Sequence, residues 1–125
     1  MREEVRRSLV SLEPTEAGLR ADFRFEPELS VFEGHFPGRP LVPGAYLIEG
    51  VRQAAARQLG RELGVAEVVE ARFTAPAGPG DALRIDVELA PDASGEGEVW
   101  TARARVECRG EAAAKLRLRL FAEVP

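Results

Sequence analysis

Two ionisable side chains, a histidine and a glutamate, stand in a pattern that suits acid–base catalysis. His35 is the only histidine of the chain, and Glu49 follows it by fourteen positions within an otherwise apolar run. A neutral imidazole can take a proton, and a carboxylic acid can give one. We expect burial among apolar residues to raise the pKa of Glu49 and so allow it to donate a proton near neutrality. The pair predicts a site where one proton is removed and another is supplied.

A group that could stabilise negative charge lies between these two residues. Pro43 and Gly44 open a helical pattern, and proline suits the first turn of a helix. The unpaired N–H groups there, that of Gly44 among them, carry the positive end of the helix dipole and can hold a developing oxyanion. Pro37, Pro40 and Pro43 fix their own φ angles, which predicts rigid geometry around His35.

One long helix is predicted after this loop. Apolar residues recur at steps of three and four from Gly44 to Leu59, and Gly60 or Gly64 can end the helix. Further apolar residues widen the stripe, and a helix that is apolar nearly all round is usually buried. We therefore expect the rest of the chain to wrap around it.

Five other segments have strand-like patterns, most of them with apolar and polar residues alternating. They are 19–25, 68–75, 82–89, 99–108 and 114–121, with 8–12 as a plausible partner of the first. The residues of 75–81 and 90–98 favour turns, and 108–112 predicts a short hairpin connection. An antiparallel sheet curled around the helix would let each strand place one face on the helix and one in water. We predict an α+β fold of this kind, the hotdog layout, as a single domain over residues 1–125.

Composition excludes several other classes of function. The chain has 125 residues and a net charge of -4, whereas a nucleic-acid surface normally needs a basic excess. No apolar run approaches the ~20 residues of a spanning helix, so we expect no membrane insertion and a cytoplasmic location. One histidine and one cysteine cannot build a standard zinc site, and Cys108 fits the apolar face of a strand as inert packing.

A longer motif surrounds the three candidate residues. The segment GHFPGRPLVPGAYLIEGVRQA, residues 34–54, resembles the FabZ and FabA type of 3-hydroxyacyl-acyl carrier protein dehydratase, whose motif reads roughly H-F-P-G-x-P-x-x-P-G with an acid fourteen positions after the histidine. The later segment EARFTAPAGPGDALRIDVEL, residues 70–89, also resembles this family. The similarity extends over most of residues 32–122, and the chain looks like a compact FabZ-like or ApeI-like member.

The resemblance implies an activity and roles for the site residues. The reaction would be the reversible loss of water from a 3-hydroxyacyl thioester on an acyl carrier protein, in fatty-acid, polyketide or related lipid biosynthesis, without a cofactor or metal. The resemblance also implies a homodimer, or a higher homo-oligomer, in which His35 of one subunit meets Glu49 of the other. The implied catalytic residues are His35, Glu49 and the amide of Gly44, and the substrate-binding candidates are Phe36, Pro43, Tyr46 and Gln53.

Other interpretations stay open at this point. His35 could be a structural residue, Glu49 could simply pair with Arg52, and Tyr46 and Trp100 could belong to the core. A basic rim for an acidic carrier protein is one possible role of Arg39, Arg52, Arg57 and Arg72. The rival functions are a hotdog thioesterase, in which Glu49 activates water, and a non-catalytic acyl-binding subunit. We also expect the chain to begin almost directly at its first strand, without the leader usual in FabZ proteins.

Overall fold

The computed structural model describes residues 1–33, 40–92 and 98–123. Two α-helices and six strands make up the fold, with one turn of 3-10 helix at Ser30–Phe32. The helices are α1 (Arg2–Ser8) and α2 (Gly44–Leu59). The strands are β1 (Leu9–Pro14), β2 (Gly18–Arg24), β3 (Leu63–Phe73), β4 (Ala82–Pro91), β5 (Val99–Cys108) and β6 (Glu111–Ala122).

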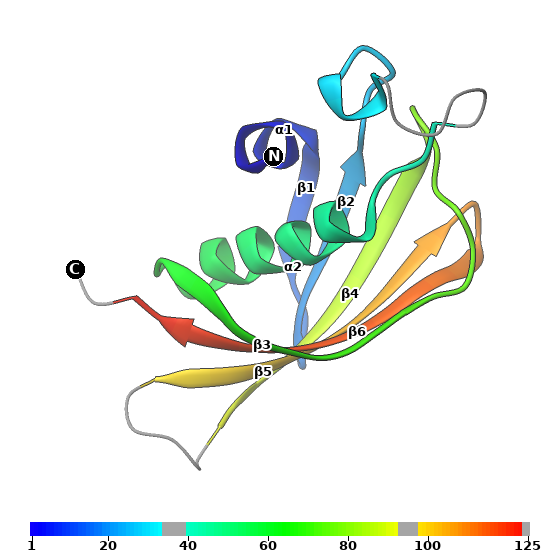
Figure 1. Cartoon of the computed structure of the whole chain (residues 1–125). Helices are drawn as coiled ribbons and strands as arrows, with labels where there is room; N and C mark the ends of the chain where they lie inside the picture. Colours follow the sequence, from blue (N-terminus) through cyan, green and yellow to red (C-terminus); the bar gives the residue numbers. More distant parts are fainter. Residues whose placement is uncertain (34–39, 93–97, 124–125) are drawn as a thin grey trace.

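The strands form one curved antiparallel sheet in the order β1-β2-β4-β5-β6-β3. Figure 1 shows α2 lying across the hollow of this sheet, with α1 beside it. The prediction of a hotdog fold is confirmed. No helix in the described ranges is long and apolar enough to cross a membrane.

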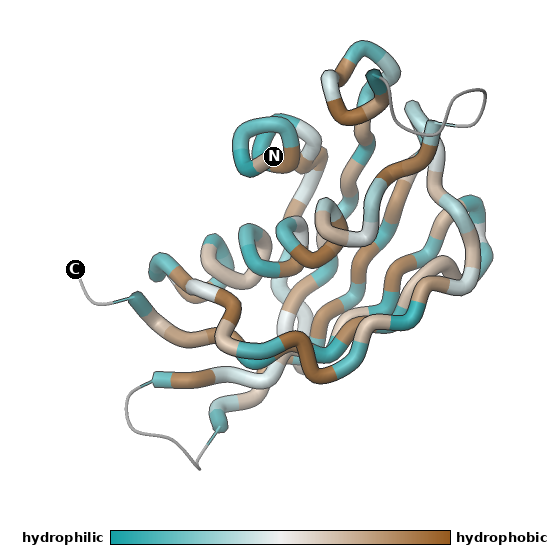
Figure 2. Tube along the Cα trace, in the orientation of Figure 1, coloured by the Kyte–Doolittle hydropathy of each residue, from teal (hydrophilic) through white to brown (hydrophobic). Residues whose placement is uncertain are grey.

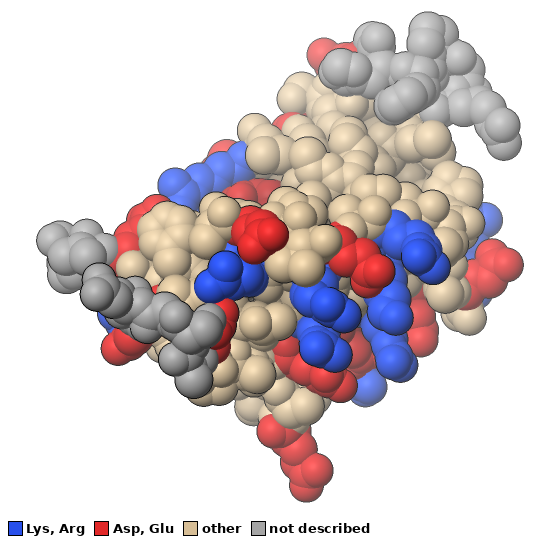
Figure 3. All heavy atoms as spheres, turned by 60° about the horizontal axis from the view of Figure 1, so that its bottom comes forward, with Lys and Arg blue, Asp and Glu red and all other residues tan. Residues whose placement is uncertain are grey.

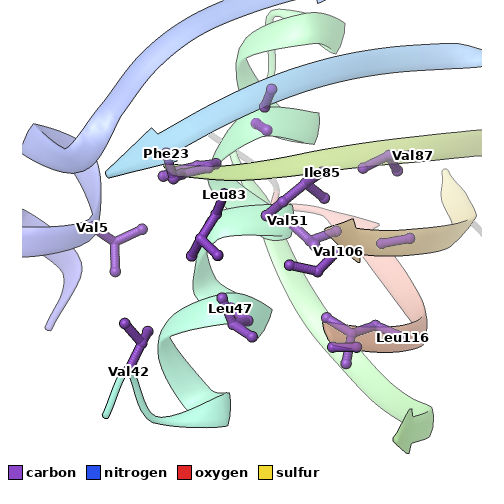
Figure 4. Close-up of a cluster of buried hydrophobic side chains, with 14 of the residues drawn as sticks. Val5, Phe23, Val42, Leu47, Val51, Leu83, Ile85, Val87, Val106 and Leu116 are labelled. Atoms are coloured by element: carbon purple, nitrogen blue, oxygen red, sulfur yellow. The ribbon is translucent and has the colours of Figure 1, made fainter. Parts of the chain in front are cut away.

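The core lies between α2 and the inner face of the sheet. Alternation along the strands puts apolar side chains on this face and charged ones on the other, as the hydropathy colouring in Figure 2 indicates. Helix α2 contributes Leu47, Val51, Ala54 and Ala55 from one side of its surface. Figure 4 shows side chains of both layers meeting there, among them Leu47, Val51, Phe23, Leu83, Ile85, Val106 and Leu116.

Two predicted chain reversals are confirmed. Helix α2 ends at Gly60, whose φ of 66° is the left-handed conformation that glycine adopts without strain. Arg109 and Gly110 have φ angles of 55° and 77° and join β5 to β6 as a two-residue turn, which confirms the short hairpin connection expected at 108–112. At its other end α2 begins at Gly44, and Pro43 is the residue that caps it rather than part of its first turn.

Three predictions about the elements were wrong. A helix precedes the first strand, because Arg2–Ser8 forms α1 and packs its Val5 into the core. Helix α2 is not buried all round, since its buried residues lie on the side toward the sheet. The strand expected at 68–75 begins earlier, at Leu63, so that Gly64 lies in β3.

Strand β3 also departs from the expected burial. It is an edge strand, paired only with β6 within the described residues. Val68, Val69 and Phe73 are 44%, 41% and 50% exposed, although we expected each strand to cover its apolar face with the helix. The fold therefore leaves a row of apolar side chains on one edge.

Candidate active site

The predicted site residues divide into two groups in the structure. His35 and Phe36 lie outside the described residues, as does Arg39 of the suggested basic rim. Pro43, Gly44, Tyr46, Glu49 and Gln53 all lie at the start or in the first three turns of α2. The helix thus brings the described candidates together on one short segment.

Gly44 stands at the N-terminus of α2 beside a small apolar groove. Its N–H has no acceptor inside the helix, because the first four N–H groups of any helix lack one. A groove of about 360 Å³ is lined here by residues that include Pro43, Gly44, Leu47 and Phe73. This arrangement places a backbone donor and the positive end of a helix dipole next to a space with apolar walls.

Gly44 lies in close contact with the ring of Phe73. A Cβ added to Gly44 would lie 2.4 Å from Cζ of Phe73, well inside van der Waals contact. The Phe73 ring at the end of β3 therefore rests directly on the first turn of α2. The sequence motif had suggested an amide donor at Gly44, and the packing adds a steric reason for glycine.

Glu49 forms a bidentate ion pair with Arg52. Arg52 Nη2 donates to Glu49 Oε2 at 2.5 Å, and Arg52 Nε donates to Oε1 at 2.8 Å. The two side chains are only 12% and 9% exposed. Arg52 Nη1 donates further to the Leu63 carbonyl oxygen at 3.0 Å, which ties α2 to the start of β3. Pairing with Arg52, one of the two interpretations left open by the sequence, is confirmed.

The ion pair reverses the expected protonation of Glu49. Burial alone would raise its pKa, but the hydrogen bonds from Arg52 and Gln53 and the charges of Arg52 and Arg2 lower it further than burial raises it. The prediction of a raised pKa was therefore wrong. Glu49 is held as a carboxylate, which accepts hydrogen bonds and can act as a base.

Gln53 donates hydrogen bonds both to the Glu49 carboxylate and to α1. Its Nε2 donates to Glu49 Oε2 at 2.7 Å and to the Arg2 carbonyl oxygen at 2.8 Å. One side chain therefore orients Glu49 and fastens α1 to α2. This contact of α1 was not predicted, because nothing in the opening residues of the sequence points to Gln53.

Tyr46 also joins α2 to α1. Its hydroxyl donates to Glu4 Oε1 at 2.7 Å, and its ring packs edge-on against Phe25. Burial and the bond to the Glu4 carboxylate raise the pKa of Tyr46 to about 12, so the hydroxyl stays protonated. Glu4 accepts from the backbone N–H and the hydroxyl of Ser30 as well. The hydroxyl of Tyr46 is thus already used within the protein.

One member of the suggested basic rim, Arg52, does not serve as predicted. Arg52 is 7% exposed and bound to Glu49, so it cannot offer its charge to a carrier protein. Arg57 and Arg72 are exposed on α2 and β3.

Among the described residues no group of three or more metal-ligating side chains comes together. Cys108 is buried, and its Sγ lies 3.7 Å from Asp81 Oδ2.

Comparison with known proteins agrees with this fold. A family model described as ApeI-like, ApeI dehydratase, matches residues 11–111. The 3-hydroxyacyl-[acyl-carrier-protein] dehydratase FabZ of Thermus thermophilus is 41% identical over 93 residues, which cover 68% of this chain and 65% of that protein. The FabZ protein of Cereibacter sphaeroides is 32% identical over 117 residues, which cover 86% of this chain and 72% of the other.

Solved structures show the same fold. The dehydratase heterocomplex ApeI:P from Xenorhabdus doucetiae contains a chain that matches with a TM-score of 0.74 and 23% identity, over 90% of this chain and 96% of that one. The fold, the motif around Glu49 and the span of the family match together lead to one conclusion: the chain belongs to the ApeI-like dehydratase family.

Proposed function

We propose that this protein catalyses the reversible removal of water from a 3-hydroxyacyl thioester to give the trans-2-enoyl thioester. The substrate would be carried on an acyl carrier protein, as the names of the FabZ relatives state for those proteins. The observation that carries the proposal is the place of Glu49 on α2, in the second turn after Gly44 and fourteen positions after His35, in a chain of this family. The pathway would be fatty-acid, polyketide or related lipid biosynthesis.

Each proposed catalytic group has one task. The Gly44 N–H would bind the thioester oxygen as negative charge develops on it, a contribution of roughly 3 to 4 kcal/mol for one such donor. His35 would remove the proton from the carbon next to the thioester carbonyl, and the pair of electrons left behind would form the double bond as the C3–O bond breaks. The apolar groove beside Gly44 suits an acyl chain.

The state of Glu49 decides where the second proton comes from. A carboxylate held by Arg52 and Gln53 has no proton to give, so Glu49 would accept a hydrogen bond from the 3-hydroxyl and orient it. The imidazolium of His35, formed in the first step, would then protonate the departing hydroxyl to give water. This assignment differs from a scheme in which Glu49 is the acid.

A two-fold dimer would complete the site. The proposal is supported by the exposed apolar side chains of β3, which include Val69 and Phe73, because a second copy placed along this edge would cover them. Phe73 also lines the groove at Gly44, so a subunit docked on β3 would border that groove. The Xenorhabdus relative is a heterocomplex, and a different subunit of the same fold is the alternative partner for this edge.

A thioesterase is the second candidate function. The ionised state of Glu49 favours it, because a carboxylate can activate water for attack on a thioester carbonyl. The two activities leave different products: a dehydratase conserves the thioester bond, whereas a thioesterase releases a free thiol.

The cytoplasmic location remains a prediction from the sequence.

The deciding experiment offers the purified chain a panel of 2-enoyl thioesters on an acyl carrier protein and on coenzyme A. We expect loss of the ultraviolet absorbance of the conjugated enoyl group without release of thiol, and without added metal or nucleotide. Release of thiol in step with substrate loss would establish the thioesterase instead. A chain that does neither on every substrate would be the non-catalytic acyl-binding subunit.

A further inference from the structure

The outer face of the sheet, turned away from α2, is built mainly of oppositely charged neighbours on adjacent strands. Arg20 Nε lies 2.8 Å from Asp86 Oδ1, and Arg84 Nε lies 3.2 Å from Asp22 Oδ1. Arg119 likewise pairs with carboxylates on two sides. Complementary pairs of this kind stabilise a sheet, and like charges placed opposite one another destabilise it.

Strands β5 and β6 break this pattern. Arg103 stands directly opposite Arg117, and Arg105 stands directly opposite Lys115. None of these four, named here the β5–β6 cation cluster, forms an ion pair with a carboxylate in the part of the chain that the structure describes. Figure 3 shows Lys and Arg side chains interspersed with Asp and Glu on this face. On the neighbouring strands Arg103 stands opposite Glu88, Arg105 opposite Asp86 and Arg117 opposite Glu70, so each of these cations has both a like and an unlike charge beside it.

A pocket of about 350 Å³ lies over this cluster. All four cations line it, together with Arg20 and three carboxylates at Glu70, Asp86 and Glu88. Asp86 is already bound to Arg20. The volume falls within the range of small-molecule sites, and cationic side chains on facing strands converge on it.

One donor in the pocket is buried without an acceptor. The Nε atom of Arg117 is shielded from solvent and has no hydrogen-bond partner among the described residues. A donor closed to solvent cannot meet an outside acceptor unless the side chain moves, so a ligand would contact the terminal Nη groups of Arg117. Arginine presents its N–H groups in a planar fork that matches the oxygen atoms of a phosphate.

We propose that the β5–β6 cation cluster binds the phosphate group of a small molecule, on the face of the sheet opposite α2 and separate from the site at Glu49. A compact anion fits better than a broad acidic protein surface, because it can contact the cations without also lying against the three carboxylates that line the pocket. The site would bind through Arg103, Arg105, Lys115 and the terminal Nη groups of Arg117. It does not depend on the dehydratase reaction.

The test is a titration of the isotope-labelled full chain with pyrophosphate at constant ionic strength, followed by NMR. We expect saturable shifts of the β5 and β6 amides and of the Arg117 Nε–H. Arg103→Gln and Arg117→Gln should each weaken binding by about tenfold or more, as expected for loss of a charge-assisted hydrogen bond. Arg84→Gln is the matched control, because Arg84 lies on the same face but is paired with Asp22.

The unfolding midpoint of each variant, measured with and without pyrophosphate, provides a second test. Without ligand, Arg103→Gln should leave the unfolding midpoint nearly unchanged, because Arg103 stands between a like charge, Arg117, and an opposite charge, Glu88. It should also reduce the rise in midpoint that pyrophosphate gives the unaltered protein, as a tenfold weaker affinity requires. Shifts that do not saturate, an equal loss of binding in Arg84→Gln, or tighter binding of a polyglutamate peptide than of pyrophosphate would each overturn the proposal.

Discussion

Arg52 Nη2 lies 2.5 Å from Glu49 Oε2, and this contact between two nearly buried side chains three residues apart on α2 defines the ionisation state of the site. A glutamate in an apolar helix would otherwise be expected to hold its proton. Here the guanidinium group of Arg52 is buried beside the Glu49 carboxylate and keeps it ionised. The acid–base roles at the site follow from this pair.

The first prediction concerns the stability that the pair provides. Glu49→Gln leaves Arg52 buried without its counter-charge, and we expect a loss of about 3 kcal/mol in the free energy of unfolding at pH 7. Because the folded state lowers the pKa of Glu49, its contribution is complete above the ordinary glutamate pKa of about 4.3 and is lost as the pH falls through the lower folded value. Denaturant unfolding of both proteins across this pH range measures the difference.

Glu62→Gln provides the control for that experiment. Glu62 pairs with Arg2 at 3.2 Å, but both side chains are more than two-thirds exposed at 69% and 67%. An exposed pair contributes about 1 kcal/mol or less. An equal effect of the two substitutions, or a Glu49→Gln difference that grows as the pH falls, would mean that Glu49 is not held ionised by burial with Arg52.

The second prediction tests the packing of Phe73 on Gly44. Gly44→Ala places a Cβ where the Phe73 ring lies, so we expect a loss of about 1–3 kcal/mol in stability and a fall in turnover. Alanine is otherwise a better helix former than glycine. The double variant Gly44→Ala, Phe73→Ala should therefore lose less stability than the sum of the two single changes. Strict additivity in thermal unfolding would show that the contact is not the cause.

The third prediction separates a structural role of Tyr46 from substrate binding. Tyr46→Phe removes the hydrogen bond to Glu4, which should lower the free energy of unfolding by about 1.5–3 kcal/mol, as for other bonds to charged groups. The sequence motif placed Tyr46 among the substrate-binding residues, whereas the structure shows its hydroxyl bound to α1. We expect KM to stay unchanged in Tyr46→Phe. A raised KM with unaltered stability would restore the substrate-binding role.

The fourth prediction concerns the proposed sharing of each site by two subunits. His35→Ala and Glu49→Gln should each be inactive alone. After joint refolding in equal amounts, about half of the dimers should be mixed, and one intact site in each gives about a quarter of all sites. Activity near a quarter of the unaltered enzyme is therefore expected. If no activity returns although mass spectrometry detects mixed dimers, both residues act within one subunit.

Much of the fold was predictable because its patterns are local. The alternation in 99–108 and the turn at Arg109 and Gly110 fix β5 and its hairpin, and Gly60 fixes the end of α2. Helix α1 was missed because it is short and held by tertiary contacts, above all Gln53 with the Arg2 carbonyl and Tyr46 with Glu4. The exposed edge of β3 was missed because the alternation of apolar and polar residues within a strand does not predict where that strand lies in the sheet.

The site was predictable in its members but not in its electrostatics. The spacing of His35 and Glu49 identifies the candidates from sequence alone, and Pro43 and Gly44 mark the start of the helix. The pKa of Glu49 depends instead on whether Arg52 reaches it or turns to solvent, and both rotamers are compatible with the sequence. Only the packed structure shows that Arg52 also bonds to the Leu63 carbonyl, which holds it in place.

The most direct test of the proposed function is to incubate the protein with a 3-hydroxybutyryl thioester of an acyl carrier protein and to analyse the products by mass spectrometry. Our account predicts a mixture of 3-hydroxybutyryl and trans-2-butenoyl carrier protein. The same mixture should form from the enoyl side, and Glu49→Gln should slow it by about a hundredfold or more. Recovery of unacylated carrier protein, or an unchanged rate in folded Glu49→Gln, would contradict the assignment.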